Sequence, residues 1–336
     1  MSSKFLFLSG QIRAMEEKLL TSSQIDRLIS ATDSQSAFRI LTELQYSEYL
    51  DEEIKPKDFL RIIYRGLRET KALIVRGTND HQAFEFLWKE IDLNNLKRAL
   101  KLKLVEGQSK IIKFREKYGF SELGRFTKED IEKCVFENEK LDIVPDEYFL
   151  AILEAQAQYP ESPDFQRIEY ILDKAHFSYL DRLSKTLDED FLKKILIYRA
   201  DKNNVLAVAR SVLLTESVVS PQAILPFGKV TLQTVQNIKN FDELNVFLQR
   251  LPHPSFSFAL DSEISHIDNL LMLEKKLDLA MMKLLLESEL GEIDSIKIPY
   301  VYFAKRLKNA SILKFIMFAK LYGLSSDIIY KTIKHF

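Results

Sequence analysis

Residues that favour tight turns are scarce in this chain. It contains 9 glycines and 9 prolines among 336 residues, whereas an average protein has about 7% glycine and about 5% proline. Because tight turns depend on these residues, we expect long elements joined by few connections. Apolar residues recur at helical spacing, as at Leu93, Leu96, Leu100 and Leu104. No run alternates apolar and polar residues between turn signals, so the sequence predicts an all-α fold.

Charge and cysteine content exclude several classes of protein. The chain carries 48 basic and 49 acidic side chains, which argues against a dedicated nucleic-acid binder with a basic surplus. Cys134 is the only cysteine, which excludes an internal disulfide framework and suits a reducing cytosol. The apolar run near the start is shorter than the roughly 7 to 15 residues of an export signal. Lysines such as Lys283 and Lys314 interrupt the longest apolar stretches, so we expect no membrane-spanning helix.

An acidic residue and an amide three positions apart occur twice. The segment EIDLNNLKRALKLK contains Asp92 and Asn95, and the segment RADKNNVLAVARSV contains Asp201 and Asn204. Such a pair offers two oxygen ligands to a hard metal ion. Neither pair has an adjacent carboxylate cluster, however, and Asp is a favoured N-cap residue. We therefore interpret the pair as the recurring start of one helix in each of several related units.

A third, degraded copy of the pair follows at a similar distance. Asn95 and Asn204 are 109 residues apart, and Ser311 lies 107 residues further on, preceded by Lys308 in the place of the aspartate. This period is longer than the roughly 20 to 50 residues of common solenoid repeats. The sequence therefore predicts three related multi-helix units. We place these units at residues 1–117, 118–222 and 223–336.

A basic segment flanks the first pair. Lys97, Arg98, Lys101 and Lys103 lie mainly off the leucine stripe, and further cations follow up to Lys117. The helix is therefore expected to be amphipathic with a basic face. Two interpretations stay open for this face. It is either a solvated helix surface or a partner interface for an acidic protein, a membrane assembly or nucleic acid.

The sequence shows no catalytic pattern. Its five histidines form neither a His-Glu-x-x-His motif nor a pair one helical turn apart. Gly119 and Gly124 have the spacing of a phosphate-binding loop, but Arg125 and Phe126 follow where lysine and a hydroxyl residue are needed. We therefore expect no catalytic residue, no metal site and no cofactor. A mechanical or scaffolding protein fits this chain better than an enzyme does.

Five segments, in this order, resemble a family of V/A-type ATPases and ATP synthases, that of the C-type stalk subunits, whose eukaryotic relative is the d-type stalk protein. They are IRAMEEKLLTSSQIDRLISATDSQSAFRILTELQYSEYL, IDLNNLKRALKLK, RIEYILDKAHFSYL, ADKNNVLAVARS and YFAKRLKNASILKFIMFAKLYGL. Their succession over nearly the whole chain carries the resemblance. The third unit departs from the family, which usually has an acidic residue at Lys308 and a more amide-like one at Ser311.

The resemblance implies both a fold and a role. The fold is three similar helical domains around a pseudo-threefold axis, forming a funnel. The role is a non-catalytic part of the rotor in the central stalk, which connects the central shaft to the membrane proteolipid ring and transmits torque for proton or sodium transport. Such a protein is peripheral, lies at the cytoplasmic face of a membrane, touches the membrane only through the ring and binds no nucleic acid. The alternatives are a cytosolic helical adaptor and a nucleic-acid-associated helical protein.

Overall fold

The computed structural model of the protein describes residues 5–44, 55–106, 120–161, 163–214, 219–251 and 267–333. Every regular element in these ranges is a helix, which confirms the predicted all-α fold. The chain divides into two compact units. Unit 1 combines Met1–His81 with Asp278–Phe336, and unit 2 is Gln82–Leu277. The threefold division and the funnel arrangement stay predictions.

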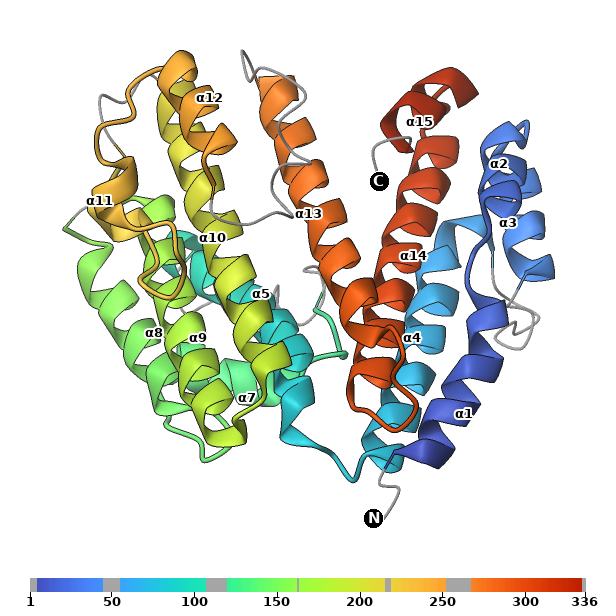
Figure 1. Ribbon diagram of the computed structural model, residues 1–336, viewed down its shortest axis with the longest axis horizontal. Coiled ribbons are helices and arrows are strands. Elements are labelled where there is room, and N and C mark those ends of the chain that lie inside the picture. Colours follow the sequence, from blue (N-terminus) through green and yellow to red (C-terminus); the bar gives the residue numbers. More distant parts are fainter. Residues whose placement is uncertain are drawn as a thin grey trace. The chain divides into compact units, whose positions relative to one another are not determined.

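Unit 1 is built from both ends of the chain. Its N-terminal elements are α1 (Leu6–Met15), η1 (Glu16–Lys18), α2 (Ser22–Ser30), α3 (Ser34–Glu43), η3 (Pro56–Asp58) and α4 (Phe59–Gly77). Its C-terminal elements are the last part of α13 (Ile267–Glu289), α14 (Lys297–Leu321) and α15 (Ser326–Ile333). Helix α14 packs against α1, α3 and α4 (Figure 1). The two ends of the chain therefore share one core, in which Leu8 and Ile12 meet Ile298 and Tyr302.

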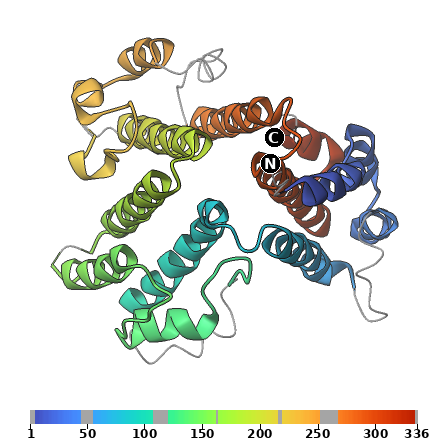
Figure 2. The ribbon, with the colours of Figure 1, turned by 60° about the horizontal axis from the view of Figure 1, so that its bottom comes forward.

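Unit 2 holds the middle of the chain. Its elements are η4 (Gln82–Phe84), α5 (Glu85–Glu106), α7 (Lys128–Ile131), η6 (Glu132–Phe136), α8 (Asp146–Gln158), α9 (Phe165–Leu187), α10 (Asp190–Leu213), η7 (Pro221–Ala223), α11 (Leu232–Val235), α12 (Phe241–Gln249) and the first part of α13. Helix α9 contacts α5, α8 and α10, and Figures 1 and 2 both show it beside α8. This helix is therefore central to the packing of unit 2.

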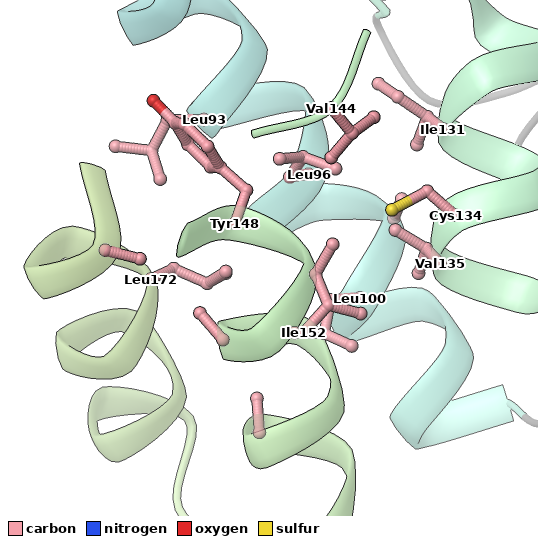
Figure 3. Packing of buried hydrophobic residues seen from close by; sticks show 14 of the residues in the cluster. Leu93, Leu96, Leu100, Ile131, Cys134, Val135, Val144, Tyr148, Ile152 and Leu172 are labelled. Atoms are coloured by element: carbon pink, nitrogen blue, oxygen red, sulfur yellow. The ribbon is translucent and has the colours of Figure 1, made fainter. Parts of the chain in front are cut away.

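An apolar cluster joins α5, η6, α8 and α9. Leu96 and Leu100 of the predicted leucine stripe are fully buried in it and lie close to Ile152 and Cys134 (Figure 3). The stripe therefore faces the core, as its spacing predicts. Burial raises the pKa of the Cys134 thiol to about 11. The thiol is consequently protonated at neutral pH, as expected of a core residue rather than a nucleophile.

Three short helices begin in the same way. Thr21, Thr127 and Thr231 are the N-caps of α2, α7 and α11. In each case the N-cap N–H donates to the side chain three residues further on, at 3.0, 2.8 and 3.1 Å. These bonds are one half of a capping box. The three threonines are 106 and 104 residues apart, close to the repeat length expected from the sequence.

Two long helices in succession recur after each of these starts. The successive pairs are α4 with α5, α9 with α10, and α13 with α14, and their lengths range from 19 to 25 residues. Across the residues that the structure describes, no helix is both long enough and apolar enough to span a membrane. Because most of these long helices bury a broad apolar surface, they pack into compact units.

Truncating a core residue of α8 is expected to destabilise the protein far more than truncating a surface residue of the same helix. Ile152 is 0% exposed and Leu150 is 63% exposed. Ile152→Ala should lower the free energy of unfolding by about 2 to 5 kcal/mol, because it leaves a cavity. Leu150→Ala should change it by less than about 0.5 kcal/mol. Urea denaturation of both variants measures the difference, and equal losses would contradict the packing described here.

Candidate functional site

Both Asp-x-x-Asn pairs lie inside long helices rather than at their starts. Helix α5 begins at Glu85, seven positions before Asp92, and α10 begins at Asp190, eleven positions before Asp201. The prediction that these residues start or cap helices is therefore wrong. In α5 the helix starts earlier because the preceding apolar residues, including Trp88, are buried and pack as helical core.

The first pair binds the backbone of the segment that follows α5. Asp92 Oδ1 accepts hydrogen bonds from the N–H groups of Arg125 (2.8 Å) and Phe126 (3.0 Å). Asn95 exchanges two bonds with Ser121: its Nδ2 donates to the carbonyl oxygen at 2.9 Å, and its Oδ1 accepts from the N–H at 3.1 Å. Both side chains are almost completely buried. We call this arrangement the first backbone clamp.

The second pair makes the same arrangement after α10. Asp201 Oδ1 accepts from the N–H of Val230 at 2.7 Å. Asn204 exchanges two bonds with Leu225, at 2.9 and 2.8 Å, and its Nδ2 also donates to the Val230 carbonyl oxygen at 2.8 Å. Both side chains are fully buried. We call this the second backbone clamp. In both clamps the asparagine holds an early residue of the connection and the aspartate holds its end.

A glycine makes each clamp possible. A Cβ atom on Gly124 would lie 3.0 Å from Asp92 Cγ, and one on Gly228 would lie 2.9 Å from Asp201 Cγ, closer than such contacts normally occur. Each glycine opens a short motif, Gly-Arg-Phe-Thr at 124–127 and Gly-Lys-Val-Thr at 228–231. These motifs end at the N-cap threonines of α7 and α11. The shared motif is a signal from which the clamps could have been predicted.

The third predicted copy does not form such a clamp. Ser311 is exposed, and its hydroxyl donates to the Leu307 carbonyl oxygen inside α14 at 3.1 Å. At the corresponding N-cap, Thr21, Lys18 stands where the other two motifs have glycine. The loss of aspartate, asparagine and glycine together indicates that the three act as one device.

The two aspartates differ in their charged neighbours. Lys89 lies 3.2 Å from Asp92 and also sits over the Phe126 ring, 3.8 Å from its centroid. Burial lowers the pKa of Lys89 and raises the pKa of Asp92, while their mutual attraction opposes both shifts. Burial also raises the pKa of Asp201, and there the backbone N–H groups of the bound segment oppose the shift. The second clamp therefore relies on backbone dipoles to stabilise its carboxylate.

The predicted basic face is largely bound to the protein itself. Lys97 forms an ion pair with Asp173 at 2.6 Å, and Lys101 pairs with Glu169. Lys103 donates to three acceptors of unit 2, including the Val135 carbonyl oxygen at 2.7 Å. Arg98 is exposed. The cations predicted at 110–117 lie outside the described residues. The use of this face as a partner interface stays a prediction.

The described part of the chain offers no chemistry of a catalytic or metal site. It contains no group of three or more His, Cys, Asp and Glu side chains placed to hold a metal ion. His176 is buried against Tyr148, with 2.7 Å between Nδ1 and Oη. Burial lowers the pKa of His176 to about 3, so the ring is neutral at physiological pH. His253, His266 and His335 lie outside the described residues.

Comparison with known protein families identifies a match over almost the full length. The chain matches the family described as ATP synthase (C/AC39) subunit over residues 8–332. A comparison with curated proteins gives no match. The matched range includes both clamps, all three N-cap threonines and every long helix.

Adding a methyl group at the second clamp is expected to destabilise the protein. In Gly228→Ala the new Cβ would overlap the Asp201 carboxylate, so we expect a loss of about 1 to 3 kcal/mol in unfolding free energy. Gly10→Ala is the matched control, because nothing lies within 4 Å of its Cβ position in α1. That variant should be neutral or more stable by up to about 1 kcal/mol. Urea denaturation compares the two, and an unperturbed Gly228→Ala variant would contradict the clamp.

The charge of Asp201 should make stability depend on pH in a definite direction. Because burial raises its pKa in the folded state, the folded protein binds this proton more tightly than the unfolded chain does. The contribution of Asp201 to stability is therefore fully present below the ordinary pKa and falls as pH rises toward the folded value. Asp201→Asn removes this titration and keeps an Oδ1 acceptor. The difference in unfolding free energy should shift in favour of the variant as pH rises above about 4, and a constant difference would contradict this assignment.

Proposed function

The chain belongs to the ATP synthase (C/AC39) subunit family, and from this premise we propose that it lies in the central stalk and joins the rotating shaft of a V/A-type ATPase to its membrane rotor ring. In this role it transmits torque and carries out no chemistry. It is peripheral, lies at the cytoplasmic face of the membrane and reaches the bilayer only through the ring. The family match over residues 8–332 is the observation that carries the proposal.

The construction of each unit supports a mechanical role. A part that transmits torque must resist bending and shear. Long helices packed at the density of a protein interior resist both. The connections after α5 and α10 are fixed by side-chain bonds to their backbone. Force applied to one helix therefore passes to the next through bonded segments rather than through slack loops.

Exposed apolar side chains lie at both ends of α14 in unit 1. Before its start, Leu290 and Ile293 are 79% and 72% exposed, and after its last residue Tyr322 is 81% exposed. The first group adjoins α1, since the N–H of Phe5 donates to Asp294 at 2.5 Å. A helix of 25 residues is about 37 Å long at roughly 1.5 Å per residue. Unit 1 thus presents two separated apolar surfaces, as a spacer between two partners requires.

Co-purification from native membranes tests the proposed function directly. The tagged full chain should bring down the ATPase head, the shaft proteins and the proteolipid ring, and its deletion should uncouple the head from the ring. An adaptor unrelated to rotary ATPases would instead bring down other proteins. A nucleic-acid-associated protein would show binding that weakens steeply with salt. Either of these results, without ATPase components, would contradict the proposal.

Replacing the apolar residues at each end of α14 should remove different partners. Leu290→Ser with Ile293→Ser changes one end, and Tyr322→Ser changes the other. Because all three side chains are exposed, each variant should keep its unfolding free energy within about 0.5 kcal/mol of the wild type. Co-purification should show that each variant loses either the ring or the shaft. Leu150→Ser, at an exposed apolar residue of unit 2, is the control, and an equal effect there would contradict the assignment.

A further inference from the structure

A small polar cavity lies in unit 2 between the start of α9 and the end of α10. Its volume is about 150 Å³, and the connection around η7 closes its third side. Arg167 of α9 and Arg210 of α10 both line it, together with the hydroxyl-bearing residues Ser211 and Ser220. The lining therefore brings two guanidinium groups from different helices to one space. Neither clamp contributes to this cavity.

Neither arginine forms an ion pair with a carboxylate among the described residues. Arg167 Nε is shielded from solvent yet has no hydrogen-bond acceptor. Other arginines of unit 2 are paired, such as Arg125 with Glu85 at 2.6 Å and Arg182 with Glu147 at 2.8 Å. Buried polar groups are nearly always hydrogen-bonded, and an exception commonly points to a site for an ion or water.

The nearby carboxylates are already engaged elsewhere. Glu169 and Asp173 of α9 pair with Lys101 and Lys97 of α5. Asp164, which lines the cavity, uses its Oδ1 to accept from the N–H of Gln166 at 2.8 Å as the N-cap of α9. The cavity consequently keeps an excess of positive charge. An anionic ligand would neutralise it.

We propose that this cavity binds a phosphate group, as free inorganic phosphate or as the terminal phosphate of a lipid headgroup. Two guanidinium groups match the double negative charge of phosphate better than the single charge of a carboxylate, and arginine favours multidentate contact with its oxygens. Hydroxyl groups in the lining add neutral donors. Drug-sized ligands occupy sites of about 300 to 1,000 Å³, so the cavity is too small for a whole nucleotide. The site does not depend on the proposed role in an ATPase.

Calorimetric titration of the full chain with sodium phosphate at low ionic strength tests this proposal. The wild type should bind one phosphate saturably, in preference to chloride at equal ionic strength. Arg167→Gln and Arg210→Gln should each weaken binding roughly tenfold or more, the loss expected for a charge-assisted hydrogen bond. Arg182→Gln removes one positive charge from a paired residue elsewhere on α9 and should bind phosphate as the wild type does. Thermal unfolding without phosphate checks that the variants fold, and phosphate should raise the wild-type midpoint.

Vesicles distinguish the two sources of the phosphate group. If phosphatidic acid in phosphatidylcholine vesicles captures the wild type but not Arg210→Gln, the ligand is a headgroup. If only inorganic phosphate binds in an Arg210-dependent way, the ligand is soluble. Absence of saturable binding to both probes would overturn the proposal. So would a loss of binding in Arg182→Gln equal to that in Arg210→Gln, because it would show general attraction to positive charge.

Discussion

Two buried aspartate–asparagine pairs satisfy the backbone of the connections that follow α5 and α10. A connecting segment packed against the interior of a helix cannot give its N–H and C=O groups to water, and leaving them unpaired costs about 1 to 3 kcal/mol each. Asp92 with Asn95 and Asp201 with Asn204 provide the missing partners. Glycine allows each segment to come close enough for these bonds. The start of the next helix is then set by the same segment.

The clamps leave charge as the second organising factor in unit 2. Lysines of α5 reach α9 and neutralise its carboxylates, so α5 and α9 are joined by ion pairs as well as by the apolar cluster. Such partly exposed pairs contribute little energy individually, but they orient the helices. Because these carboxylates are taken up by lysines, the arginines around the cavity keep their positive charge uncompensated. The same set of charges thus explains both an internal contact and a cavity that attracts anions.

These features suit a protein that works by shape. Family membership places it among the components of an ATPase, and the described residues bring together no metal-binding cluster. The buried ionisable groups have structural partners: His176 is neutral against Tyr148, and Asp92 lies beside Lys89. Shifted pKa values are common at catalytic sites, but here each of these shifts is accounted for by burial and internal contacts. Mechanical continuity is the property that the structure provides.

The sequence by itself determined the fold class, the core face of α5 and the absence of a recognisable catalytic motif, because helical spacing and residue type are local properties. It also revealed the Asp-x-x-Asn repeat. Only the tertiary structure decided what that repeat does, since the bonded partners lie 21 to 34 residues away. The same holds for Lys97 and Lys101, whose partners on α9 are 76 and 68 residues distant. Side chains that look like caps or surface charges in one helix acquire their roles from segments that folding brings against them.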